Sequence, residues 1–520
     1  MNTTELDASL KKIAKGTGIV LTGTIIGMFL GLASRIIITR YITPYEYGLL
    51  SLALTITGIA TTIACLGLPT ATPRYIAFYE AKKDKAKVWQ TIKMSFSFSF
   101  IFSMALFFLA FLFADKLAIL FNEPEVAPVI KILSFIIPVR AIIGIIVPIF
   151  RGLGDVKPKV YFQDIFPYIT KIPLVLVVIL FGWAFRGIIY ATLFSFVALG
   201  VISLFYCLKK IPHFIPLQEK IKPSSSKPLA KELILFSLPL FTAIILSIVI
   251  SSTDTLMLGY FKTAKDVGLY RVAYPLARYI SLILSAAGFI YFPIATGLYS
   301  GNLTSELKKM YSVTTKWVFS VTLPLFFLVF FAPKPTLYFL FGPNYIQAAP
   351  ALRILALGFF IHTFLGLNGQ NLIVLGKAKF IMLNNFVVAI LNVLLNLQLI
   401  PKFGLEGAAF ASFVSLSAGN ILASCELYKI SGIHPFSKNY LKPVIFSCFL
   451  AIAYFFVMQR LTINIYLQVI FFGAGFTIIS FLSIILTKSL DREDLMILRA
   501  TQQKLDINLP WVEKLLKKFI

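Results

Sequence analysis

The 520-residue sequence is poor in charged residues, and this scarcity already excludes most soluble folds. Only 13% of its residues are charged, whereas soluble domains contain about 25%. By contrast, 58% of the residues are hydrophobic and the mean hydropathy is +0.87. A chain of this composition cannot hide its apolar surface in water, so the sequence predicts an all-α integral membrane protein.

Other absences narrow the function. The four cysteines lie in apolar stretches without paired spacing, so neither a disulfide framework nor a metal site follows. No Walker A loop, HExxH or GxSxG pattern occurs, and the three histidines are far apart in the sequence. The N-terminus lacks the apolar core and cleavage site of a secretory signal. We therefore expect no enzyme activity, no cofactor and no direct use of ATP.

Fourteen apolar runs are long enough to cross a bilayer as helices, which takes about 20 residues. Two of them are interrupted, 127–150 by prolines and Arg140, and 347–370 by Arg353 and His362. The predicted spans lie near 17–38, 46–68, 92–113, 127–150, 161–182, 185–207, 232–258, 267–295, 314–338, 347–370, 377–399, 405–428, 440–458 and 462–486.

The distribution of Lys and Arg predicts the orientation of these spans. With the N-terminus inside, roughly 33 of the 48 cations fall on cytoplasmic segments and about ten on the opposite side. Both termini are therefore expected in the cytoplasm, in a multi-pass protein of the cell membrane. The net charge of +26 fits this asymmetry and attraction to anionic lipids. The basic residues are scattered over short loops, so no nucleic-acid partner is expected.

A short motif occurs twice and indicates an internal repeat. Residues 40–50 read RYITPYEYGLL, and residues 259–270 read GYFKTAKDVGLY. Three further pairs of segments match in the same order at offsets between 219 and 222, including a match of Lys131 with Arg353. Spans 1–6 thus correspond to spans 7–12. Because six is even, the two units are expected to be parallel repeats with a cavity between them.

The repeat predicts five parts of the chain. These are an N-lobe (1–208), a cytoplasmic linker rich in Pro, Ser and Lys (209–231), a C-lobe (232–430), two extra spans (440–486) and a cytoplasmic amphipathic tail (487–520). The extra spans have no counterpart in the N-lobe. In the repeated motif, Gly48 and Gly268 are expected to permit close approach or positive φ.

Three segments carry a family resemblance: SRIIITRYITPYEYGLLSLA (34–53), LGLPTATPRYIAFY (66–79) and STDTLMLGYFKTAKDVGLYRVA (252–273). Together with the 12+2 span count, they resemble the polysaccharide/oligosaccharide flippase branch of the multidrug/oligosaccharidyl-lipid/polysaccharide exporter superfamily. The resemblance implies two lobes that alternate between inward- and outward-facing states. It also implies transport of a glycan on a polyprenyl (pyro)phosphate from the inner to the outer leaflet. We expect the protein to act as a monomer.

Cations inside the spans fit such a substrate. Arg271 and Arg278 lie two helical turns apart on one face, and guanidinium groups bind phosphate oxygens in bidentate fashion. The alternatives for Arg35 are a contact with Asp254 that forms in one state, a static buried pair, and snorkelling. For Arg74, a place among cytoplasmic headgroups is equally open. The predicted substrate-binding set is Arg35, Arg271, Arg278, Arg140, Lys171, Arg40 and Arg74.

Polar residues in the C-lobe raise the question of ion coupling. Asn385, Asn392 and Asn396 fall at helical spacing on one face. Such amides either bond neighbouring helices or line the pathway and an ion site. Relatives include members driven by Na⁺ or H⁺, so Asp254, Asn385 and Asn392 are the predicted coupling residues. The resemblance also implies that spans 13 and 14 form a groove for the lipid tail, while lipid packing or dimer contact remains open.

Three rival functions remain. A membrane enzyme acting on the same lipid carriers would ordinarily need a large outer loop, whereas every predicted outer loop is short. A multidrug antiporter predicts acidic rather than basic residues in the N-lobe cavity and no spans 13 and 14. A peptidoglycan-precursor flippase shares both the 12+2 arrangement and the cations, and is the hardest rival to exclude.

Overall fold

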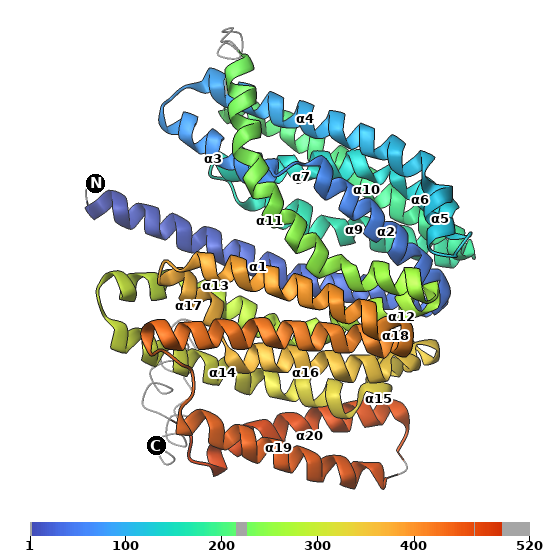
Figure 1. The fold of residues 1–520 in the computed structure, drawn as a ribbon, viewed down its shortest axis with the longest axis vertical. Helices are drawn as coiled ribbons and strands as arrows, with labels where there is room; N and C mark the ends of the chain where they lie inside the picture. The colour runs from blue at the N-terminus through green and yellow to red at the C-terminus, as the bar shows by residue number, and fades with distance from the viewer. Residues whose placement is uncertain (1–2, 215–225, 462, 491–520) are drawn as a thin grey trace. The chain divides into compact units, whose positions relative to one another are not determined.

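The computed structural model describes residues 3–214, 226–461 and 463–490, and every regular element in these ranges is helical (Figure 1). Within these ranges, twelve helices are long and apolar enough to cross a membrane, or thirteen if one bent pair counts as a span. The molecule is thus a multi-pass integral membrane protein. The predicted tail from 491 onward and residues 215–225 of the predicted linker lie outside the described ranges.

The bent pair corresponds to the predicted run at 127–150. It consists of α6 (Val126–Ser134) and α7 (Ile136–Gly152), which meet at 44°. Prolines inside such a run remove backbone donors, and neighbouring helices in the bundle can stabilise the resulting break.

The chain divides into two compact units, residues 1–268 and 269–520. This division describes packing, so the repeat boundaries at 208 and 232 stay a prediction. The first unit contains α1 (Thr3–Tyr41), α2 (Pro44–Ala64), α3 (Leu68–Ala81), α4 (Lys85–Leu112), α5 (Ala114–Leu120), α6, α7, α8 (Lys157–Lys159), the π-helix η1 (Val160–Ile165), α9 (Phe166–Leu180), α10 (Ala184–Phe214) and α11 (Ser226–Phe261).

Helix α12 (Ala264–Arg278) begins in the first unit and continues into the second. The second unit then contains η3 (Tyr279–Ser281), α13 (Leu282–Ser300), α14 (Thr304–Phe331), α15 (Pro333–Phe341), η4 (Pro343–Ala348), α16 (Ala349–Leu365), α17 (Asn368–Val374), α18 (Ala378–Ser431), α19 (Lys438–Gln459) and α20 (Ile465–Leu486). Its buried core includes the large aromatic side chains of Tyr311, Phe319 and Phe327.

Helix α18 spans 54 residues and folds back on itself. Gly404 has φ 54° and ψ −124°, a backbone conformation outside the helical region. On either side of it, Asn384 donates to Glu426 at 2.7 Å, and a Cβ on Gly419 would lie 2.5 Å from the side chain of Val388. The two halves of α18 therefore run antiparallel, as the separate predicted runs at 377–399 and 405–428 require.

The two copies of the repeated motif form matching helix starts. Thr43 caps α2, where its backbone N–H and hydroxyl both donate to the Glu46 carboxylate. Thr263 makes the same two bonds to Asp266 at the start of α12. Such a capping box satisfies backbone donors that the first helical turn leaves open. The two motifs thus share local structure as well as sequence.

The two helix starts also contact each other. The buried carboxylate of Glu123 accepts from the hydroxyl of Tyr45 at 2.7 Å and from the backbone N–H of Ala264 at 2.8 Å. Glu123 therefore holds the first turn of α2 and the first turn of α12 together within the first unit.

Candidate functional site

Two of the predicted cations lie together in the first unit. Gly27 and Gly31 of α1 face η1 and α9, where added Cβ atoms would lie 2.3 Å from the carbonyl oxygen of Asp164 and 2.9 Å from the Tyr168 ring. Small residues at this spacing allow close packing of membrane helices. The packing brings Arg35 on α1 within electrostatic range of Lys171 on α9.

Arg35 and Lys171 are both half-buried, and neither forms an ion pair with an acidic residue in the described ranges. Each cation near the middle of a bilayer costs about 2.5–3.5 kcal/mol on insertion scales. Repulsion between the two like charges adds to this cost. An anion bound between them would offset both the insertion cost and the repulsion.

A polar cluster nearby was missed by the sequence reasoning. Asp164, in the π-helix η1, accepts from the Lys159 ammonium at 2.8 Å and from the Thr24 hydroxyl at 3.1 Å. The Lys159 ammonium also donates to Thr24 at 3.0 Å. Thr24 is more than 130 residues away in the chain, so only the close packing of α1 reveals the cluster. The spacing of Gly23, Gly27 and Gly31 was the available signal.

The other predicted cations of the first unit are Arg140, Arg74 and Arg40. Arg140 on α7 is half-buried, with its guanidinium 5.3 Å from the centre of the Phe196 ring. Arg74 on α3 is exposed and stacks over Phe236 at 4.0 Å. Arg40 lies in the last turn of α1 and is also exposed. Cation–π contacts of this kind contribute about 0.5–2 kcal/mol.

Arg271 and Arg278 both lie on α12, and Arg278 is its last residue. Arg271 is half-buried and Arg278 is exposed. Pro275 lies between them, and the 3₁₀ turn η3 follows directly. The spacing predicted one shared face; the structure gives the two guanidinium groups different exposure along that face.

The predicted coupling residues fall into different environments. Asp254 on α11 is buried, with 4% of its surface exposed. In the second unit, Asn392 and Asn396 are buried, and the Asn396 amide donates to Asn392 at 3.0 Å. The Asn392 amide approaches the Ser415 hydroxyl at 3.4 Å, across the two halves of α18. The Asn396 bond thus lies within one half of α18 and the Asn392 bond joins the two halves, while the role of these amides in the pathway stays a prediction.

Asn385 does not join them. Its side chain is exposed, whereas the adjacent Asn384 is buried and donates to Glu426. Helical spacing alone put Asn385 on the face of Asn392 and Asn396. Near the beginning of α18, the neighbouring half-helix covers residue 384 instead, because its Glu426 carboxylate accepts from that amide.

A second polar network was also missed. His362 on α16 bonds the side chain of Asn420 at 2.7 Å. The amide of Asn368 donates to the Asn420 carbonyl and to the Ser424 hydroxyl, both at 2.9 Å. The network joins α16 and α17 to the second half of α18, and each of its three bonds links residues more than fifty positions apart in sequence.

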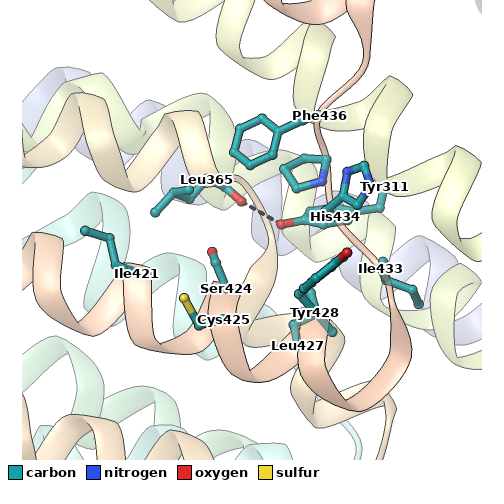
Figure 2. Close-up of a pocket in the computed structure, with 11 residues that line it drawn as sticks. Tyr311, Leu365, Ile421, Ser424, Cys425, Leu427, Tyr428, Ile433, His434 and Phe436 are labelled. Atoms are coloured by element: carbon teal, nitrogen blue, oxygen red, sulfur yellow. Dashed lines mark hydrogen bonds between the residues drawn. The ribbon is translucent and has the colours of Figure 1, made fainter.

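A cavity of about 450 Å³ lies beside this network (Figure 2). The Tyr311 hydroxyl donates to the Leu365 carbonyl at its edge, at 2.6 Å. Its wall is formed by residues of α14, α16 and the second half of α18, and by the segment 433–436 before α19. None of the predicted site residues lines it. Its mostly apolar wall suits a hydrocarbon segment rather than a phosphate.

Comparison with known proteins agrees with this architecture. Residues 13–298 match the family described as "Polysaccharide biosynthesis protein". The chain belongs to this family. Residues 239–397 also match the MatE family. The earlier resemblance to the polysaccharide branch of the exporter superfamily is thereby confirmed.

Two relatives match this family member at low identity, one over most of its length and one over about a third of it. The uncharacterized membrane protein MJ1068 of Methanocaldococcus jannaschii is 23% identical over 487 residues, which is 89% of this chain and 94% of that protein. The probable low-salt glycan biosynthesis flippase Agl15 of Haloferax volcanii is 25% identical over 169 residues, 32% of this chain and 36% of that protein.

Two solved structures share the fold. The lipid II flippase MurJ in an inward closed conformation has a TM-score of 0.69 at 15% identity, covering 92% of this chain and 99% of its own. An inward-facing multidrug resistance MATE family transporter has a TM-score of 0.64 at 17% identity, covering 80% and 98%. Agl15 and MurJ are named as flippases and the MATE protein as a transporter, and none of the three is named as an enzyme.

Proposed function

We propose that this protein is a flippase for polyprenyl-(pyro)phosphate-linked oligosaccharides or polysaccharide repeat units. The substrate passes from the inner to the outer leaflet by alternating access between two lobes. The observation that carries the proposal is the pair Arg35 and Lys171, two half-buried cations in spans, close enough to interact and without an acidic ion-pair partner in the described ranges. Such a pair favours an anionic substrate.

The remaining cations extend this role. Arg271 and Arg278 supply guanidinium groups from the second unit, and Arg140, Arg40 and Arg74 supply more from the first. Guanidinium stays charged at all relevant pH values and fits phosphate oxygens in pairs. The names of two Haloferax volcanii relatives, a probable glycan biosynthesis flippase and a probable flippase, support a glycan substrate.

The topology proposed is 12+2 spans with both termini in the cytoplasm of the cell. It counts α6 and α7 as one span and the two halves of α18 as two. The reciprocal helix starts at Thr43 and Thr263 support two parallel six-helix repeats. The asymmetry of Lys and Arg supports the orientation.

An ion gradient is the proposed energy source, with Asp254 as the coupling group. A buried carboxylate inside a membrane helix marks a proton or cation pathway by default. The amide pair of Asn392 and Asn396 would offer neutral oxygen ligands in the other unit. Asn385 is a weaker candidate because its side chain is exposed.

Two rival substrates share the fold. A peptidoglycan precursor is favoured by the MurJ structure, which is named as a lipid II flippase. A cationic drug is favoured by the MATE structure. Arg35 and Lys171, which pair with no acidic residue in the described ranges, disfavour the drug because they would repel it.

The substrate class can be tested with purified full-length protein in proteoliposomes. Fluorescent lipids are added that carry a diphosphate-linked oligosaccharide, a diphosphate-linked muramyl peptide, or the same oligosaccharide on an uncharged lipid. A membrane-impermeant quencher added outside then removes the fluorescence of lipids that have reached the outer leaflet, while lipids in the inner leaflet stay protected. We expect fast flipping of the diphosphate-linked oligosaccharide alone. Equal flipping of the uncharged lipid, or preferred flipping of the muramyl peptide, would reject the proposal.

A further inference from the structure

A second cavity in the second unit combines cations, amides and aromatic rings at one end of the helices. It measures about 470 Å³ and lies between α14, α15 and α16 on one side and α19 and α20 on the other. Lys334, Arg353, Gln459 and Gln468 supply its polar groups. A cavity of this size is within the usual range for small-ligand sites, about 300–1,000 Å³.

The floor of this cavity is aromatic. Phe331 at the end of α14 packs against Phe455 of α19, with ring centres 5.2 Å apart. Phe455 in turn lies 6.3 Å from Phe472 of α20. The cavity therefore exists because the extra helix pair covers the end of α14. Its rim is cationic and its floor is apolar, the pattern expected for an amphiphile.

Arg353 is held in place at the rim. Its Nε donates to the carbonyl oxygen of Phe330 at 2.9 Å, and its guanidinium lies 5.9 Å from the Phe330 ring centre. Phe330 is in the last turn of α14, where carbonyls lack helical partners. This cap accounts for Nε and leaves the two terminal nitrogens of the guanidinium for another acceptor. In the described ranges, no acidic residue pairs with Arg353 or Lys334.

The first unit contains a similar segment, but there one of the two cations pairs with a carboxylate. Residues 113–116 read FADK after α4, and residues 331–334 read FAPK after α14. In the first unit, Asp115 accepts from the ammonium of Lys131 at 2.8 Å with one oxygen and 2.9 Å with the other. Lys131 is the residue that matches Arg353 in the repeat. The wall of the cavity in the second unit contains no carboxylate, and Pro333, the first residue of α15, lies beside Lys334 there.

The first unit also has a cavity beside residues 113–116, and its wall differs in charge from that of the cavity in the second unit. It measures about 450 Å³ and is lined by Asp115 and by small or apolar residues and Asn122, with no cation in its wall. The wall of the second unit's cavity thus contains two cations and an aromatic floor, whereas that of the first unit contains one carboxylate and no cation. Two unpaired cations above an apolar floor attract a phosphate that carries a hydrocarbon chain.

We infer that the cavity between α14, α15, α19 and α20 binds the phosphate headgroup of a membrane lipid, with Lys334 and Arg353 as its ligands and the first carbons of the chain against Phe331, Phe455 and Phe472. The charge asymmetry predicts this end of the helices on the outer side. The site is separate from the transport cations and does not depend on the proposed function.

The test measures lipid binding to purified full-length protein by native mass spectrometry in neutral detergent. Three probes are compared: phosphatidylglycerol, phosphatidylcholine with the same chains, and glycerol 3-phosphate without chains. We expect binding of phosphatidylglycerol only. Lys334→Gln with Arg353→Gln should weaken it at least about tenfold. Pro333→Asp, which adds a carboxylate to the cavity wall beside Lys334 and keeps the Arg353 cap, should weaken it similarly.

The matched control is Lys116→Gln with Lys131→Gln in the first unit, which should bind phosphatidylglycerol like the wild type. The inference is overturned if the Pro333→Asp variant retains full binding, or if the control loses as much as the variants. Equal binding of phosphatidylcholine would remove the role of charge. Equal binding of glycerol 3-phosphate would remove the role of the chain. None of these readouts depends on transport.

Discussion

Gly48 and Gly268 pack against each other in a reciprocal arrangement. A Cβ on Gly48 would lie 1.6 Å from the carbonyl oxygen of Ala264, and a Cβ on Gly268 would lie 1.9 Å from that of Pro44. Pro44 and Ala264 are themselves matched positions of the repeated motif. Each motif thus presents its glycine to the other's first helical residue. The repetition in sequence serves a contact that only two glycines allow.

Substitution of Gly48 tests this contact. Gly48→Ala places a methyl group where a backbone oxygen lies, so the two helix starts must separate. We expect a loss of about 1–3 kcal/mol in stability, measured as a lower melting temperature in detergent, together with reduced transport. Gly58→Ala on the same helix is the control, because its Cβ would meet only Arg140 at 3.6 Å. A Gly48→Ala variant as stable as the control would contradict the contact.

The packing of α1 predicts a second stability effect. Gly27→Leu would drive its side chain into the backbone of η1, so we expect a loss of about 1–3 kcal/mol. Gly18→Ala on the same helix meets nothing within 4 Å and should be neutral or up to about 1 kcal/mol stabilising. Thermal unfolding followed by fluorescence compares the two. Equal melting temperatures would mean that α1 does not pack on η1 as described.

The turn within α18 predicts a third effect. Gly404 has a positive φ of 54°, which side chains of L-residues rarely adopt. Gly404→Ala should therefore cost about 1–3 kcal/mol. Gly473→Ala in α20 has no neighbour within 4 Å and serves as the control. If Gly404→Ala melts at the wild-type temperature, the two halves of α18 do not require this turn.

The proposed coupling role of Asp254 predicts a change in energetics rather than in folding. Asp254→Asn keeps the size of this buried side chain but removes its charge. We expect a variant that still inserts and binds substrate but no longer accelerates when a Na⁺ or H⁺ gradient is imposed. Flipping rates with and without ionophore provide the measurement. A gradient response equal to that of the wild type would place coupling elsewhere.

Most of the fold was accessible from sequence because membrane spans are long and apolar. Each of the fourteen predicted runs overlaps a helix, and the two weak ones at 127–150 and 347–370 are α6 with α7 and α16. The position of the break between α6 and α7, at residue 135, was not predicted. The prolines in this run indicate that the helix is interrupted but not at which residue. The turn at Gly404 was implied by two adjacent runs with Pro401 between them.

The candidate site was accessible only in part. Cations inside spans stand out in any sequence, so Arg35 and Lys171 could be named in advance. Their proximity depends on Gly27 and Gly31, whose effect appears only when α1 packs on α9. Asp164 was overlooked because Thr24 is distant from it in the sequence and reaches it only when α1 packs on η1. Asn385 was misplaced because spacing on one helix says nothing about which neighbour covers it.

The most direct test of the account is the flipping rate of a diphosphate-linked oligosaccharide by Arg35→Ala and Arg271→Ala proteins in proteoliposomes. Arg186→Ala, an exposed cation at the start of α10, is the control. The account predicts at least about a tenfold loss in each of the two variants, since each removes a charge-assisted contact, and a wild-type rate in the control. Wild-type rates in both Arg35→Ala and Arg271→Ala would contradict it.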